Sequence, residues 1–337
     1  MSVSFQVPDL GQKHWMELPE NPLISYDGTS RTAIGDPQVI LPQEFDGKWH
    51  MFFHGYMPGV GNGLVFFHHV SEDGIHWKEH KRWLDWTVGQ NYIYCDGSQW
   101  VMYYTCDLRN YPDQKANYDC DTLIRAKTTK DFETWSEEID CILPETSLER
   151  EGRVIEARNP CAILLPNGKI RLYYSAGTVW LDDTNYEEPK YIFYAEADSP
   201  LGPFKKADKP MLMPDPKIPY RNYGCGAIKV FSYEKGYLGL YNPIWLDEKK
   251  SSRSQICLLA SDDGIHWEEA ACNPVIAPTT GWRKVIVYQL DIVCHDGFMW
   301  MYFNARDDWM DGVERIGCCR FELKGMAEPK KLRKPFH

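Results

Sequence analysis

The sequence predicts an all-β chain folded as a five-bladed β-propeller, and three observations support this prediction. Five segments share a pattern of strand, tight turn and strand; a third strand follows each segment; and a polar turn with an aromatic anchor ends the first four units. The heptapeptide SEDGIHW at 71–77 returns almost unchanged as SDDGIHW at 261–267. Because internal repeats mark repeat architectures, we expect a ring of similar β units.

Each repeat begins with a predicted β-hairpin. Its turn contains Asp-Gly, Asn-Gly or Lys-Gly, and the flanking runs are rich in the β-branched and aromatic residues that favour strands. No stretch shows sustained helical periodicity, which excludes a helical solenoid. The turn glycines lie roughly 50 to 70 residues apart, as expected for four-stranded blades: Gly47, Gly97, Gly168, Gly236 and Gly297.

The repeats predict one domain over residues 1–337. The fifth unit lacks an outer turn, so its fourth strand is expected from a terminus, either the N-terminal SFQV or the C-terminal segment. The SxDGxxW turns are interpreted as structural, with Trp77 and Trp267 packed against strands at the periphery. The predicted blades span approximately 35–86, 87–144, 154–215, 222–278 and 284–323.

Composition excludes several classes of partner. A chain of 337 residues with 43% hydrophobic and 25% charged residues is typical of a soluble globular protein. The net charge of -11, without a long Lys/Arg run, argues against nucleic acid or a membrane surface as partner. Without a leader pattern or an apolar run of about 18 residues, a cytoplasmic location is expected. The eleven cysteines are then reduced, and no CxxC pair indicates zinc.

The predicted geometry gathers polar residues on one face. Successive strands of a blade run antiparallel, so first-strand starts and second-strand ends meet around the axis. Carboxylates and amides flanked by Trp and Tyr suit a small carbohydrate, with aromatic faces for sugar rings. No cofactor and no metal ligands are assigned. The candidate substrate-binding residues are Arg31, His54, Asp107, Arg158, Asn159, Trp180, Tyr223, Asn242, Gln289 and Arg306.

Three motifs carry a resemblance to a known group of enzymes. GDPQVIL opens the first blade, RNPCAILLPNGKIRLYYS opens the third, and DSPLGPF closes it. Over about residues 35–323 the chain resembles the five-bladed glycoside hydrolase clan that includes families 43, 62, 32, 68, 117 and 130. The resemblance implies that Asp36, in its xDP context, is the general base or nucleophile. Some relatives hold calcium in the axial channel, which nothing in this sequence indicates.

Two of the three carboxylates implied by the resemblance are replaced. Asn159 stands where relatives have a second Asp, and the fourth blade opens with RNYGCGAIK, which lacks the general-acid Glu. Glycoside hydrolysis ordinarily needs a second carboxyl to protonate the leaving oxygen. The nearest substitutes are Glu156 and Asp291, so the candidate catalytic residues are Asp36, Glu156 and Asp291. A salt bridge from Glu156 to Arg158 or Arg153 is the structural alternative.

The sequence therefore predicts a glycoside hydrolase acting on a short oligosaccharide or glycoside. One alternative is a glycoside phosphorylase, in which Arg31, Arg158 and Arg306 would bind phosphate. The other is a carbohydrate-binding propeller without catalytic activity. Sugar identity, linkage, stereochemical outcome and oligomeric state are not indicated by the residues.

Overall fold

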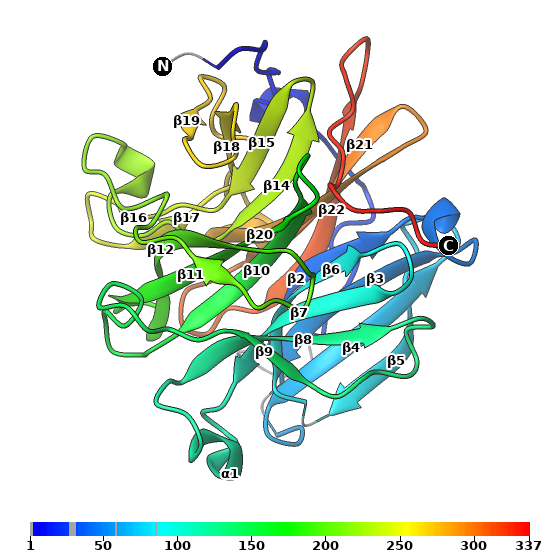
Figure 1. Cartoon of the computed structure of the whole chain (residues 1–337). Coiled ribbons are helices and arrows are strands. Elements are labelled where there is room, and N and C mark those ends of the chain that lie inside the picture. The colour runs from blue at the N-terminus through cyan, green and yellow to red at the C-terminus, as the bar shows by residue number, and fades with distance from the viewer. Residues whose placement is uncertain (1–2, 27–31, 58, 85) are drawn as a thin grey trace.

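The computed structural model describes residues 3–26, 32–57, 59–84 and 86–337. It contains four sheets of four strands and one of six, arranged as a ring of five blades, which confirms the predicted propeller (Figure 1). Blade 1 contains β2 (Ala33–Ile40), β3 (Trp49–Tyr56), β4 (Leu64–Ser71) and β5 (Lys78–Leu84); blade 2 contains β6 (Val88–Cys95), β7 (Trp100–Asp107), β8 (Thr122–Thr129) and β9 (Ile139–Ile142); blade 3 contains β10 (Ala157–Leu164), β11 (Ile170–Leu181), β12 (Tyr186–Ala197) and β13 (Lys205–Lys206); blade 4 contains β14 (Ile228–Tyr233), β15 (Gly236–Tyr241), β18 (Cys257–Ser261) and β19 (Glu268–Glu269); blade 5 contains β20 (Ile286–His295), β21 (Phe298–Arg306), β22 (Glu314–Glu322) and β1 (Met16–Glu17).

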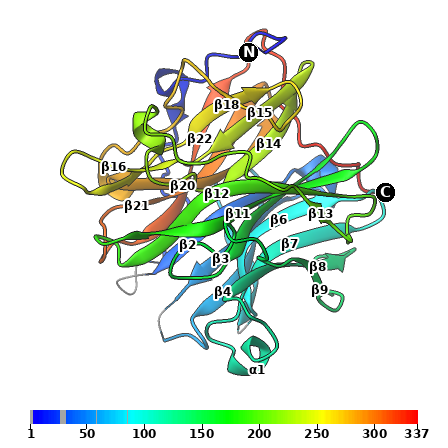
Figure 2. The ribbon, with the colours of Figure 1, turned by 60° about the vertical axis from the view of Figure 1, so that its left-hand side comes forward.

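The remaining elements are short. The strands β16 and β17 form a hairpin that extends the sheet of blade 5 beyond β20. The long strands β11 and β12 lie at the front of the view in Figure 2. No helix among the described residues is long and apolar enough to cross a membrane. The bounds of these elements are β16 (Ile244–Leu246), β17 (Ser252–Ser254), α1 (Pro112–Lys115) and the 3-10 helices Gln12–His14, Pro42–Glu44, Pro219–Arg221 and Gly281–Arg283.

The N-terminal segment closes the ring, but through a different strand from the SFQV segment predicted as one of two candidates. β1 pairs antiparallel with β22, and Met16 lies opposite Arg320. SFQV instead lies against blade 4, where the Ser4 N–H donates to Asp262 and Phe5 packs on Tyr233. The last blade thus gains its fourth strand from residues about ten positions after SFQV.

The C-terminal segment is the second part of the chain that links the blades of the ring. The Lys330 and Ser232 backbones pair at blade 4, and the Leu332 carbonyl accepts from Leu164 N–H at blade 3. Farther on, the Lys334 N–H donates to a carbonyl of β6 in blade 2. The segment therefore crosses from blade to blade.

The repeated heptapeptide is a peripheral turn, as predicted. In its first copy, Ser71 Oγ accepts from Gly74 N–H, and Asp73 Oδ1 accepts from the N–H groups of Ile75 and His76. The half-buried Trp77 indole donates to the Gly74 carbonyl. The second copy, at 261–267, makes the same Ser and Asp contacts. The side chains thus satisfy turn donors that no strand partner reaches.

Each of these turns is also tied to the preceding blade by a tyrosine. The Tyr302 hydroxyl of blade 5 donates to the Gly74 carbonyl of blade 1 at 2.8 Å, and Tyr173 of blade 3 donates to Gly264 of blade 4 at 2.9 Å. Tyr103 of blade 2 reaches the Pro200 carbonyl in the outer turn of blade 3. The repeat therefore recurs because it completes contacts between blades.

Gly74→Ala tests this contact. A Cβ at Gly74 would lie 2.8 Å from the Tyr302 hydroxyl and 3.2 Å from the Trp49 ring, at a φ of +75°. We expect urea unfolding to show a loss of more than about 3 kcal/mol, from backbone strain and overpacking together. Gly47→Ala is the matched control, because Gly47 has φ +90° and open space around it, and should lose only about 1 kcal/mol. Equal losses would mean that the contact with Tyr302 contributes nothing.

Candidate active site

A pocket of about 630 Å³ lies at the end of the ring where the first strands begin. Strands of blades 1, 2, 3 and 5 contribute residues to its lining, and blade 4 contributes residues that flank β14 and β15. Ligand pockets generally have volumes of about 300 to 1,000 Å³, so this one is large enough for a small-molecule ligand.

β-Bulges in four inner strands aim side chains into the pocket. In β2, β6, β10 and β20, two residues lie opposite one residue of the neighbouring strand. A bulge bends its strand and redirects the extra side chain. The pocket-lining residues of these bulges are Asp36, Gly89, Gln90, Asn159, Tyr288 and Gln289.

Proline and positive φ mark two of these bulges. Asp36 and Asn159 have φ values of 55° and 56°, in the left-handed region that Asp and Asn tolerate better than most residues. Pro37 and Pro160 follow them, and a residue without an N–H is best accommodated where the ladder is interrupted. The DP and NP pairs therefore specify the backbone that presents the two side chains.

Asp36 is buried, and one of its two carboxylate oxygens has no hydrogen-bond partner among the described residues. Its N–H donates to Asn304 Oδ1 at 3.2 Å, and the residue is 5% exposed. Its Oδ1 is buried and has no hydrogen-bond partner. Its Oδ2 lies 3.6 Å from His54 Nδ1, and burial lowers the pKa of His54 against the opposing pull of Asp36. A neutral imidazole thus stands beside a carboxylate that has capacity to accept a proton or bind a hydroxyl.

Seven of the predicted substrate-binding residues line this pocket. Asn159 donates through its backbone to Thr105, and its side-chain amide makes no hydrogen bond to a described residue. Asn242 and Gln289 bond to each other, which leaves Gln289 Oε1 without a partner. The pocket members of the predicted set are His54, Asp107, Arg158, Asn159, Asn242, Gln289 and Arg306.

Two other predicted binding residues lie outside the pocket lining. The Tyr223 hydroxyl donates to the Trp180 carbonyl at 3.0 Å, and the Arg153 guanidinium stacks 4.4 Å from the centre of the Trp180 ring. The first contact joins the β11–β12 hairpin to the segment before blade 4, and the second joins it to the segment before blade 3. Trp180 and Tyr223 therefore lie outside the pocket lining, and their contact with a ligand stays a prediction. Arg31 falls outside the described residues.

Glu156 does not reach the pocket. Its side chain is fully buried, and Oε1 lies 2.7 Å from Arg158 Nε. Burial raises the pKa of Glu156 to about 7, although Arg158 opposes this shift. Arg158 lines the pocket while Glu156 does not, and the ion pair between them is the one predicted as the structural alternative. The catalytic role of Glu156 stays a prediction.

Asp291 is also buried outside the pocket lining. Its Oδ2 accepts from Val39 N–H at 2.7 Å and lies 2.5 Å from Lys331 Nζ, which also donates to the Val39 carbonyl. Burial lowers the pKa of Lys331, and Asp291 opposes that shift. Asp291 therefore binds the C-terminal segment to the inner strands of blades 1 and 5. This placement gives Asp291 a structural role, and its predicted catalytic role stays a prediction.

Two pocket carboxyls, at the starts of third strands, were not among the predicted site residues. Third strands run in the same direction as first strands, so they also begin at the pocket face. Glu188 lies near the start of β12 and Glu314 begins β22. Leu64 and Thr122, which begin β4 and β8, line the same pocket. YEEPK at 186–190 was the sequence signal that could have identified Glu188.

These two carboxyls differ in their partners. Glu314 is bound on both sides, by Arg306 Nη1 and by Asn304 Nδ2, each at 3.3 Å. Glu188 makes no hydrogen bond to a described residue, and its nearest cation is Arg158 Nη2 at 3.7 Å. Burial raises the pKa of Glu188 to about 8, Arg158 opposes the shift, and Glu314 and Glu156 add to it. Burial likewise raises the pKa of Glu314.

Every described arginine of the pocket is paired with acid. Arg109 binds Asp107 and Glu187, Arg158 binds Glu156, and Arg306 binds Glu314. The pocket therefore offers little uncompensated positive charge. Among the described residues, the only group of His, Cys, Asp and Glu side chains close enough to share a metal ion lies elsewhere, at 68, 80 and 133.

Comparisons with known proteins identify the fold. No protein-family model matches the chain, and no curated protein matches it. Solved structures do. A glycosyl hydrolase from Bacteroides ovatus aligns with TM-score 0.64 and 15% identity, covering 97% of this chain and 99% of the other. A structure from a study of family 130 mannoside phosphorylases, a family said to contain hydrolases that target β-1,2-mannosidic linkages in Candida mannan, aligns with TM-score 0.65 and 14% identity, covering 97% and 99%.

A family 117 glycoside hydrolase from the marine bacterium Zobellia galactanivorans aligns with TM-score 0.61 and 17% identity, covering 92% of this chain and 90% of the other. At such identities the likeness establishes a shared propeller architecture. The alignments extend over nearly the whole of each chain, so the ring as a whole is similar.

Lys331→Met tests the structural role of Asp291. The substitution leaves a buried carboxylate without its cation, so urea unfolding should show a loss of about 3 to 5 kcal/mol. Lys330→Met is the control: this neighbour is exposed, and its change should stay within about 0.5 kcal/mol. If Lys331→Met unfolds like the control, the buried pair does not hold the C-terminal segment. Adding Asp291→Asn should recover part of the loss.

Proposed function

We propose that this chain hydrolyses the glycosidic bond of a short oligosaccharide or glycoside in the pocket, with Asp36 as general base or nucleophile. The observation that carries the proposal is the buried, unpartnered Oδ1 of Asp36, presented on a left-handed backbone at the pocket wall. A strained backbone at a concave site is typical of functional residues. The similarity to propeller-fold glycoside hydrolases and phosphorylases supports the general class of reaction.

Glu188 is the proposed proton donor, in place of Glu156. A general acid must be protonated at the working pH and must reach the leaving oxygen. Glu188 lines the pocket, and its pKa of about 8 keeps most of it protonated near neutral pH. Asp36 and Glu188 would then supply the two unlike carboxyls that glycoside hydrolysis requires.

Glu314 has a different proposed role. Both of its oxygens are engaged, and Asn304 joins it to the backbone of Asp36. Glu314 therefore orients Asn304, and Asn304 in turn fixes Asp36. This assignment makes Glu314 a positioning residue and leaves Glu188 as the pocket glutamate with free capacity.

The charge balance favours water over phosphate as the attacking group. Phosphate recognition needs cations that are free to form charge-assisted hydrogen bonds. The described pocket arginines are each paired with carboxylates, and several acids surround them. Amides such as Asn159 and Gln289 are instead suited to neutral sugar hydroxyls.

Asp36→Asn tests the base. The change keeps the side-chain volume but removes the charge that accepts a proton, so kcat/KM on a responsive aryl glycoside should fall by about 100- to 10,000-fold. Circular dichroism and the melting temperature should stay close to those of the wild type. Asp9→Asn, an exposed change outside the pocket, is the control for activity. Wild-type turnover by Asp36→Asn would contradict the proposed reaction centre.

Glu188→Gln tests the acid through leaving-group dependence. Substrates with poor leaving groups should lose about 100- to 10,000-fold in kcat/KM, whereas activated aryl glycosides, whose departure needs little protonation, should lose much less. Glu196→Gln is the matched control, because Glu196 lies on the same strand but pairs with Arg171 outside the pocket. An equal loss on every substrate would assign Glu188 a binding role instead.

The pH dependence gives an independent test of Glu188. Because the acid acts in its protonated form, kcat/KM for a poor leaving group should decline as pH rises through about 8. In Glu188→Gln this alkaline limb should disappear from the remaining activity. Persistence of the same limb in the variant would assign it to another group.

A further inference from the structure

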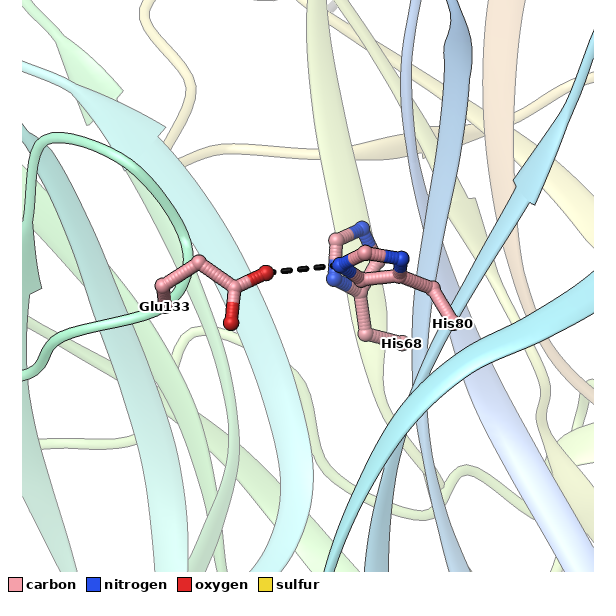
Figure 3. A group of neighbouring side chains, drawn as sticks. All are labelled: His68, His80 and Glu133. Carbon is pink, nitrogen blue, oxygen red and sulfur yellow. Dashed lines mark hydrogen bonds and ion pairs between the residues drawn. The ribbon is translucent and has the colours of Figure 1, made fainter.

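Three side chains outside the pocket converge at the rim between blades 1 and 2. His68 lies on β4, His80 on β5, and Glu133 in the turn that follows β8 (Figure 3). Their candidate ligand atoms all lie within 4.8 Å of one another. Figure 3 shows the Glu133 carboxylate pointing toward the two rings, which overlap in the view. The ring centroids of the two histidines are 4.9 Å apart, at an angle of 71°.

Two local features bring these residues together. Between β4 and β5 the register shifts, so that His68 lies opposite Lys81 and His69 opposite Glu79. His80 is the extra residue of this bulge, which turns its ring toward His68. Glu133 stands at the turn position that Ile75 and Ile265 occupy in the two SxDGxxW turns. The acid replaces an apolar residue at the place where blade 2 meets blade 1.

A chain of hydrogen bonds fixes the tautomer of His68. Asp46 Oδ1 accepts from His50 Nε2 at 2.8 Å, so the neutral His50 ring presents Nδ1 as an acceptor. His68 Nε2 lies 2.8 Å from that Nδ1 and must donate to it. The other nitrogen of His68, Nδ1, then carries a lone pair. It is buried without a partner, in a residue that is 2% exposed.

The other two side chains are accessible from solvent. His80 and Glu133 are 45% and 42% exposed in their side chains, and His80 Nε2 lies 2.6 Å from Glu133 Oε1. Lys81 Nζ holds the second oxygen, Oε2, at 2.7 Å. That contact orients the carboxylate and leaves Oε1 to face the histidines.

We propose that His68 Nδ1, His80 Nε2 and Glu133 Oε1 bind one Zn²⁺ ion. Two imidazoles and a carboxylate are a common zinc ligand set, with water in the fourth position of a tetrahedron. Ligand atoms around zinc lie about 3.3 Å apart, so the three side chains need small shifts from their present separations. On binding, the ion takes the place of the proton between His80 Nε2 and Glu133 Oε1; the neutral His80 ring keeps its one proton on Nδ1, and Nε2 and the carboxylate oxygen donate lone pairs to the ion.

The structure also supplies a hydrogen-bond acceptor for the N–H group of a metal-bound histidine. Metal-bound histidines usually donate their other N–H to a carboxylate or a similar acceptor, and the His50–Asp46 relay provides this for His68. The ion would join the third strand and outer strand of blade 1 to the outer turn of blade 2. We infer that it acts as a clamp between blades, because the site lies at the rim and away from the pocket.

Zinc titration of the untagged full-length chain, stripped with a chelator, tests the proposal. Calorimetry should show one Zn²⁺ per chain, and the ion should raise the melting temperature. His80→Gln and Glu133→Gln change exposed ligands and should fold normally, yet each should lose both effects. Asp46→Asn, which weakens the support for His68, should reduce affinity by about 10- to 100-fold.

His76→Gln is the matched control. His76 is an exposed histidine of the same blade that pairs with Asp73 in its own turn, so its loss should leave the zinc stoichiometry and the thermal shift unchanged. Absence of one-site binding in the wild-type chain would overturn the proposal. Wild-type binding by both His80→Gln and Glu133→Gln would overturn it as well, because the ion would then sit elsewhere.

Discussion

The closure of the ring depends on the buried ion pair between Asp291 of blade 5 and Lys331 of the C-terminal segment, which joins the last blade to the first. Inner strands that converge on an axis leave backbone groups that need partners, and Lys331 supplies a donor there to the Val39 carbonyl while Asp291 accepts from the Val39 N–H. The C-terminal segment that carries Lys331 also contacts blades 2, 3 and 4. Neither member of the pair lines the pocket. The pocket is lined instead by the bulges, which lie nearer the starts of the inner strands.

The bulges convert a repeated scaffold into a site of unlike residues. A regular strand would alternate its side chains, whereas two residues opposite one let Asp36, Asn159 and Gln289 turn toward the axis. The third strands add acids from farther out, and Glu188 enters on the long β12. Hydrogen bonding then distinguishes the two buried glutamates: Asn304 and Arg306 donate to Glu314, whereas Glu188 makes no such hydrogen bond to a described residue.

Local patterns predicted the ring well because its elements are local. Turn glycines, aromatic strands and the repeated heptapeptide each specify structure over a few residues. Asp36 was expected on the axial face from its DP pair, and it lines the pocket. Glu156 and Asp291 were expected at the pocket and lie outside its lining, because strand-start position does not reveal which group a neighbour covers: Arg158 pairs with the first and Lys331 with the second. Glu188 and the His68–His80–Glu133 group were missed for a related reason. The place of Glu188 in the pocket depends on the direction of the third strands. The His68–His80–Glu133 group depends on a register shift in blade 1 and on contact between blades 1 and 2.

The most direct test of the central claim is product analysis in oxygen-labelled water, with a panel of glycosides and with or without inorganic phosphate. If Asp36 directs water to the sugar, the label should appear in the released reducing sugar and the rate should not depend on phosphate. Turnover only with phosphate, yielding a sugar phosphate, would contradict hydrolysis. Binding of the sugars without any turnover would leave the pocket as a carbohydrate-binding site and contradict the catalytic account altogether.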